Sequence, residues 1–224
     1  MEENTTVYLI RHSVRFDLLD LIDGYHTDQD RNLKREKIIL SVEGEKRAEK
    51  LANEKELQNI DVAYVSNCVR TLETAKYLVE KQNIKVNIDE RFDERRLGID
   101  NKDKYPNWFE LELLDENFKT EGGESQIDVQ KRYIPAFDEA VEKNKGKRIA
   151  IFSHGIAITY FLLRWCKVES VNAESKRICL SFKGKVFFDK RYNAPEVFKI
   201  VLDKNNHPQS IELITFDDIE QMDV

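Results

Sequence analysis

Two short apolar segments of this chain each end at a histidine: VYLIRH ends at His12 and IAIFSH ends at His154. Arg11 precedes the first histidine and Arg15 follows it, so that imidazole would lie beside two guanidinium groups. The planar donor groups of arginine match the oxygens of a phosphate, and a neutral imidazole is a nucleophile. This spacing predicts an anion-binding site that contains a nucleophilic histidine.

Two residues further along the chain extend the pattern. Arg70 and Glu94 each follow another short apolar segment. Each residue is ambiguous alone, because a histidine after a strand is more often structural and Arg70 could be a solvated arginine in the first turn of a helix. Asp93 and Glu90 are also as available as Glu94. What favours one shared site is that all four parts fall after successive apolar segments.

The chemistry that such a set could perform is phosphoryl transfer through histidine. That reaction needs a neutral imidazole nitrogen, cationic donors for the phosphate oxygens, and an acid that protonates the departing alkoxide. The sequence offers His12 as the nucleophile, Arg11, Arg15 and Arg70 as the cations, His154 as a donor to a phosphate oxygen, and Glu94 as the proton donor.

The elements that position these residues can be predicted from the apolar pattern. Continuous β-branched and aliphatic segments are typical of strands buried on both faces of a parallel sheet, and ligands bind just beyond the carboxyl ends of such strands. We therefore expect both imidazoles to open onto one crevice. Strand and helix patterns alternate, which predicts an α/β fold: a three-layer α/β/α sandwich with a mostly parallel central sheet. The expected strands are 7–12, 61–66, 85–89, 148–153, 178–182, 197–202 and 211–216, the expected helices are 41–54, 67–81, 125–144 and 155–166, and a hairpin turn is expected at 203–208.

Two segments interrupt this alternation. Residues 17–37 are polar and too long for a simple turn, which predicts a lid-like segment. Residues 99–124 combine a charged loop with a short amphipathic helix, and we expect them to form a small insertion over the sheet. The aromatic side chains of Tyr105, Trp108 and Phe109 in this insertion could contact an organic leaving group or simply pack the insertion onto the body.

Composition limits the classes of function. A chain of 224 residues with 41% hydrophobic content can form one domain over residues 1–224. The net charge of -6 argues against a nucleic-acid partner. No apolar segment reaches membrane-spanning length and no leader peptide is evident, so we expect a cytoplasmic protein with no membrane partner. The three widely spaced cysteines favour free thiols over disulfides or a cysteine-rich metal site.

Six motifs in this order resemble the histidine phosphatase superfamily, the phosphoglycerate mutase-like enzymes. The resemblance extends from Val7 to about Leu163. Its motifs are LIRHSVR at 9–15, LSVEG at 40–44, SNCVRTLETA at 66–75, FDERRLG at 92–98, GGES at 122–125 and FSHG at 152–155.

The resemblance implies a three-layer fold and a two-step mechanism that needs no metal or cofactor. In this mechanism His12 is phosphorylated and water then hydrolyses the phosphohistidine. Carried over by position, Arg11, Arg70 and His154 complete the phosphate pocket with His12, Glu94 is the proton donor, and Arg15 supplies the second arginine of the R-H-x-x-R form typical of the phosphatase branches. The implied substrate is a small phosphorylated metabolite or a phosphoprotein.

The chain departs from the family pattern in ways that bear on function. Ser13 replaces the usual glycine, and we expect the loop to adjust to it. The 99–124 segment shows no convincing match to the arginine-rich and aromatic segment that mutases use, which favours a phosphomonoester hydrolase over a mutase-type phosphotransferase. A noncatalytic phosphate-binding module is the alternative from a different class, and Glu94 argues against it because a pure binder needs no acid at the leaving-group position.

Overall fold

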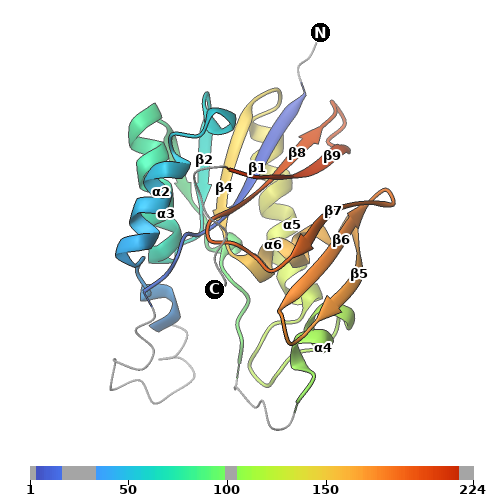
Figure 1. The fold of residues 1–224 in the computed structure, drawn as a ribbon. Coiled ribbons are helices and arrows are strands. Elements are labelled where there is room, and N and C mark those ends of the chain that lie inside the picture. The colour runs from blue at the N-terminus through green and yellow to red at the C-terminus, as the bar shows by residue number, and fades with distance from the viewer. Residues whose placement is uncertain (1–3, 17–33, 99–104, 217–224) are drawn as a thin grey trace.

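A six-stranded sheet forms the centre of the computed structural model, which describes residues 4–16, 34–98 and 105–216 (Figure 1). The strand order is β3-β2-β4-β1-β8-β9. The first four of these strands pair in parallel, and β8 and β9 pair antiparallel to their neighbours. Their bounds are β1 Thr5–Arg11, β2 Val62–Val65, β3 Lys85–Ile88, β4 Arg148–Ser153, β8 Glu196–Leu202 and β9 Pro208–Ile214.

Helices cover both faces of the sheet. Figure 1 shows α2 (Val42–Leu51) and α3 (Val69–Gln82) on one side and α5 (Gln126–Lys143) and α6 (Gly155–Leu162) on the other. Successive side chains of a strand point to opposite faces of the sheet. In β1, Tyr8 and Ile10 therefore pack with α2 and α3, and Val7 and Leu9 pack with α5 and α6. The three-layer α/β/α fold with a mostly parallel sheet is therefore confirmed.

Local sequence signals explain where two of these helices begin. The Ser41 side chain accepts a hydrogen bond from the backbone N–H of Gly44 and caps α2. Ser125 and Asp128 form a reciprocal capping box at the start of α5. Gly44 also allows α2 to approach the loop after β1, because a Cβ atom there would lie 2.0 Å from the carbonyl oxygen of Val14.

A second, antiparallel sheet lies beside the body of the molecule. It consists of β5 (Cys166–Asn172), β6 (Arg177–Phe182) and β7 (Lys185–Lys190) in that order. The short helix α4 (Trp108–Leu114) lies next to this sheet (Figure 1). The described residues also contain a helical turn at 34–37 and two single turns of 3-10 helix, η1 (Lys55–Leu57) and η2 (Glu90–Phe92).

The prediction of one helix over residues 155–166 was wrong at its end, because α6 stops at Leu162 and β5 begins at Cys166. Neither β5 nor β7 was predicted. β5 has no buried residue and β7 has only Phe188, and a bulge between Val168 and Ser170 interrupts the alternation of half-buried and exposed residues that identifies such a strand.

The two segments predicted to interrupt the alternation of strands and helices, 17–37 and 99–124, both include residues outside the described ranges. Of the lid-like segment predicted at 17–37, residues 17–33 lie outside them, as do residues 99–104 of the predicted insertion. The described part of that insertion contains α4, and its Phe109 and Leu113 pack into the core cluster that α5 and α6 share. Within the described ranges, no helix has the length and apolar character needed to cross a membrane.

Candidate active site

His12 directly follows β1 and is 6% exposed. Its Nδ1 lies 2.7 Å from the carbonyl oxygen of Ser13. A carbonyl only accepts hydrogen bonds, so Nδ1 must carry the proton and Nε2 keeps its lone pair. Burial and the nearby guanidinium groups of Arg70 and Arg11 hold the pKa of His12 well below its usual range. His12 is therefore a neutral imidazole whose Nε2 is nucleophilic.

The loop after His12 accommodates Ser13. The Ser13 side chain is fully buried, and its backbone N–H donates a 2.9 Å hydrogen bond to Oγ1 of Thr74 on α3. Thr74 in turn donates to the carbonyl oxygen of Arg70. These bonds attach the end of β1 to the helix that carries Arg70.

His154 follows β4, and its ring centroid lies 5.3 Å from that of His12. Its Nδ1 is 2.9 Å from Nη2 of Arg70, and its Nε2 is 2.9 Å from Oγ of Ser66. Ser66 donates its own proton to Oδ1 of Asp93 at 2.6 Å. Burial and the Arg70 guanidinium hold the pKa of His154 well below its usual range. The ring is therefore neutral, with its proton on Nε2.

The structure differs here from what the sequence predicts. We expected both imidazoles to open onto one crevice, but His154 is fully buried and does not line the cavity that His12 lines. The reason is that Ser66 and Arg70 occupy both nitrogens of its ring.

Cys68, Asp93 and His154 are the one group among the described residues whose ligand atoms could together hold a metal ion, all within 4.8 Å of one another. The Ser66 hydroxyl already bonds both Asp93 and Nε2 of His154. A metal ion could bind there only by displacing that hydroxyl.

Arg70 lies in the first turn of α3 after β2, and Arg11 is the last residue of β1. Arg70 is 5% exposed, donates from Nη1 to the carbonyl oxygen of Arg35 at 2.6 Å, and has a buried Nε with no hydrogen-bond partner among the described residues. Arg11 donates from Nη1 to the carbonyl oxygens of Tyr192 and Asn193 at 3.2 and 2.7 Å. Each guanidinium is thus fixed by backbone carbonyls, and each lines the cavity.

Arg15 lies at the rim of the site. It is exposed, it lines the same cavity, and its backbone forms an isolated bridge with Leu40.

Glu94 lines the cavity from the loop after β3 and η2. Its Oε1 accepts 2.9 Å hydrogen bonds from the backbone N–H groups of Arg95 and of Ala157 in the first turn of α6. Its Oε2 has no hydrogen-bond partner within the described part of the chain. Asp93, which the sequence leaves as an equal candidate for the acid, instead bonds Ser66 and the backbone N–H of Asn67.

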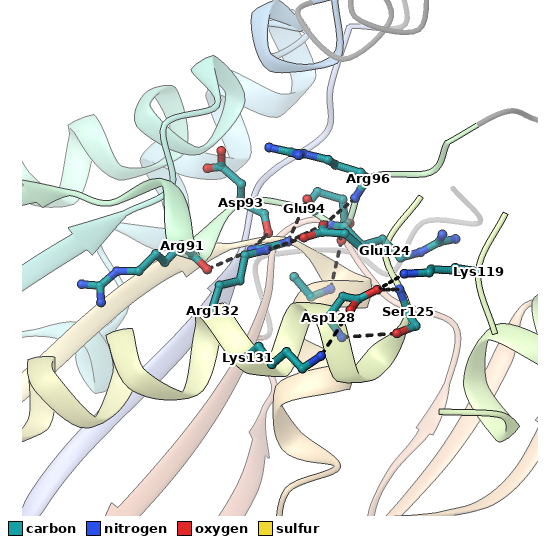
Figure 2. Close-up of polar contacts among 12 residues, drawn as sticks. Arg91, Asp93, Glu94, Arg96, Lys119, Glu124, Ser125, Asp128, Lys131 and Arg132 are labelled. Atoms are coloured by element: carbon teal, nitrogen blue, oxygen red, sulfur yellow. Dashed lines mark hydrogen bonds and ion pairs between the residues drawn. The ribbon is translucent and has the colours of Figure 1, made fainter. Parts of the chain in front are cut away.

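Arg132 on α5 holds the loop that presents Glu94, a role that no sequence pattern indicates. Figure 2 shows its guanidinium among the carbonyl oxygens of Arg91, Asp93 and Glu94, which accept hydrogen bonds of 2.8, 2.9 and 3.2 Å. Nε and Nη2 of Arg132 also bond the two carboxylate oxygens of Glu124, each at 2.9 Å. GGES at 122–125 is thus more than a turn, because its glutamate orients Arg132.

The site residues share one cavity of about 780 Å³. His12, Arg11, Arg15, Arg70 and Glu94 line it, together with the aromatic residues of the 105–118 segment. The cavity therefore combines a neutral imidazole, guanidinium groups and a carboxyl group with an aromatic lining. A volume of this size suits a small-molecule ligand.

The sequence pattern of the histidine phosphatase superfamily (branch 1) matches residues 7–180, and the chain belongs to this family. No curated protein sequence is significantly similar to it.

Solved structures of low sequence identity share the fold. A mycobacterial glucosyl-3-phosphoglycerate phosphatase is 18% identical, with 95% of this chain and 97% of that chain covered and a TM-score of 0.64. YhfR of Bacillus stearothermophilus is 20% identical, with 96% and 98% covered and a TM-score of 0.63. A phosphoserine phosphatase of Entamoeba histolytica, in complex with 3-phosphoglyceric acid, is 17% identical, with 96% and 100% covered and a TM-score of 0.61.

Proposed function

We propose that this protein hydrolyses phosphomonoesters through a phosphohistidine on His12, with Glu94 as the proton donor. The observation that carries this proposal is the hydrogen bond from Nδ1 of His12 to the Ser13 carbonyl, because it leaves Nε2 unprotonated. A buried imidazole with a lowered pKa stays in this nucleophilic form at neutral pH.

In the first step, Nε2 of His12 attacks phosphorus and the bond from phosphorus to the leaving oxygen breaks. The departing alkoxide takes a proton from Glu94, and Oε2 is the oxygen available for it. Arg11, Arg15 and Arg70 stabilise the negative charge on the transferring group. Because guanidinium groups supply this charge, the proposed reaction uses no metal ion or cofactor.

In the second step, water attacks the phosphohistidine. The Glu94 carboxylate takes a proton from that water, the nitrogen–phosphorus bond breaks, and inorganic phosphate leaves. His12 then recovers its neutral state, and Glu94 is again protonated for the next cycle.

We propose that a bound phosphate draws the Arg70 guanidinium away from Nδ1 of His154, so that Nδ1 can take a proton and donate to a phosphate oxygen. Asp93 supports that imidazolium through the Ser66 hydroxyl.

The substrate in this proposal is a small phosphorylated metabolite. The cavity volume supports it over a phosphoprotein, and the similar structures include phosphatases named for small phosphate esters. We further propose that the chain acts as one domain over residues 1–224.

An assay with an aryl phosphate tests the proposal. Replacing the nucleophile in His12→Ala should lower kcat by a factor on the order of 10³ or more. The matched control is His207→Ala, because His207 is an exposed histidine in the β8–β9 turn and does not line the cavity. Equal rates for wild type and His12→Ala would overturn the mechanism. Phosphate binding without turnover by the wild type would indicate a noncatalytic module.

A further inference from the structure

Next to Glu94, the cavity is lined by side chains that the proposed reaction does not use. They come from the loop after Glu94, from α4 and from the β5–β6 turn of the small sheet. These side chains are Arg95, Trp108, Phe109, Glu112 and Lys176.

Two of these charged groups compensate each other. Arg95 and Glu112 form a buried ion pair, and the Arg95 guanidinium also lies 5.7 Å from the centre of the Trp108 ring. Burial raises the pKa of Glu112 to about 7, and the charges of Glu94 and Lys176 both act on this carboxyl group. Glu94, Lys176 and the ion pair therefore lie close enough for their charges to influence one another.

Lys176 adds a positive charge that is not compensated in this way. Its ammonium lies 4.5 Å from the ring centre of Phe109 and 5.4 Å from that of Trp108. It has no hydrogen bond or ion pair with any described residue, and it is half-buried. Two aromatic faces hold an ammonium in place without neutralising it, so it remains available to an anion.

The backbone of the β5–β6 turn positions the Lys176 side chain. Lys176 has a φ of 56° in the β5–β6 turn, a left-handed conformation that favours glycine or asparagine. The turn brings Lys176 over the α4 rings and into the cavity lining.

We propose that Lys176 binds a carboxylate on the leaving alcohol, so that the preferred substrate is the phosphate ester of a small hydroxy acid. This inference rests on the proposed function. One ammonium matches one carboxylate, while Trp108 and Phe109 contact the carbon skeleton between that carboxylate and the oxygen that Glu94 protonates.

Two substrates that differ only at the proposed contact test this inference. 3-Phosphoglycerate carries a carboxylate where glycerol 3-phosphate carries a neutral hydroxymethyl group. The wild type should have a kcat/KM ratio of at least about 10 in favour of 3-phosphoglycerate, since a hydrogen bond between charged groups is worth roughly that factor or more. Lys176→Met should bring the ratio close to one, and Lys176→Arg should restore most of it.

Lys183→Met is the matched control. Lys183 lies in the other turn of the same small sheet, also with a positive φ and also over an aromatic ring, but it does not line the cavity. This variant should keep the wild-type ratio. A wild-type ratio near one, or equal losses on both substrates in Lys176→Met, would overturn the inference alone. Absence of hydrolysis with both substrates and with an aryl phosphate would overturn the proposed function and this inference with it.

Discussion

The hydrogen bonds around His154 determine which of its ring nitrogens carries the proton. Arginine only donates, so Nδ1 accepts from Arg70. Ser66 has one proton, and Asp93 as a carboxylate can only accept it, so the serine oxygen accepts from Nε2 of His154. A protonated Nδ1, as the proposed role of His154 requires, would give an imidazolium that Asp93 supports through the Ser66 hydroxyl.

Replacing Asp93 by asparagine tests this chain of contacts. Asp93→Asn keeps an acceptor for Ser66 but removes the negative charge that favours the imidazolium, so the pKa of His154 should fall further. We expect kcat to drop about 10-fold and the basic limb of its pH profile to move to lower pH. Asp138→Asn is the control, because Asp138 on α5 is half-exposed and forms an ion pair with Arg164. A pH profile identical to that of the wild type would contradict a role for Asp93.

The lowered pKa of His12 also has a consequence for stability. In the unfolded chain His12 binds a proton below about pH 6.5, whereas the folded protein keeps it neutral to lower pH. The unfolded state then holds more protons, so stability is present above about pH 6.5 and is lost as the pH falls below it. His154 acts in the same direction.

Urea unfolding at several pH values checks this sign. Each histidine can add up to about 1.4 kcal/mol per pH unit to the decline below pH ~6.5. The decline of the free energy of unfolding with falling pH should be shallower in His12→Gln than in the wild type, and it should be unchanged in His207→Gln. An equal slope in all three proteins would show that His12 titrates normally in the folded state.

At the scale of elements, helix α5 positions the loop that carries Glu94. Arg132 of α5 bonds three carbonyl oxygens of residues 91–94, and Glu124 holds its guanidinium (Figure 2). The first turn of α6 then fixes the Glu94 carboxyl through the Ala157 N–H. The position of Glu94, the proposed proton donor, therefore depends on α5 and α6 as well as on its own loop.

Removing the Arg132 guanidinium should affect both stability and turnover. Arg132→Met leaves the half-buried Glu124 and three carbonyl groups without their donor, at a cost of about 2–4 kcal/mol in the free energy of unfolding. Adding Glu124→Gln should recover part of that stability but not kcat. Lys131→Met, at the neighbouring position whose side chain is 73% exposed, is the control. If kcat survives in Arg132→Met, the loop does not depend on this arginine.

The sequence predicted the elements of the body better than these contacts between elements. Strand-end positions and residue types were enough to select His12, Arg70 and Glu94. Arg132 could not be found in this way, because its local pattern on a helix points to Asp128 four residues earlier, whereas its partners are Glu124 and distant backbone carbonyls. The one-sided strands β5 and β7 escaped prediction for a related reason, since their partners define them more than their own pattern does.

At the scale of the molecule, the cavity is assembled from segments far apart in the sequence. The ends of β1 and β2, the loop after β3, α4 and the small sheet all contribute to its lining. An anion bound among them would link these segments, and a ligand that binds only the folded state stabilises it.

Inorganic phosphate should therefore stabilise the protein against heat. At a phosphate concentration of about 100 times its Kd, the free energy of unfolding should rise by about 2.7 kcal/mol. Each kcal/mol raises Tm by about 2–4 °C in a protein of this size. Arg70→Met should lose this gain because it removes a cation whose buried Nε has no partner among the described residues. Chloride at matched ionic strength is the control, and an equal rise in Tm with chloride would argue against a specific phosphate site.

Trapping the covalent intermediate tests the central claim most directly. Wild-type protein mixed with an aryl phosphate and quenched in alkali, where a phosphohistidine survives, should gain the mass of one phosphoryl group on the peptide that contains His12. The same peptide of His12→Ala should gain none. Steady hydrolysis by the wild type with no phosphoryl group on His12 at any time of quenching would contradict nucleophilic attack by this histidine.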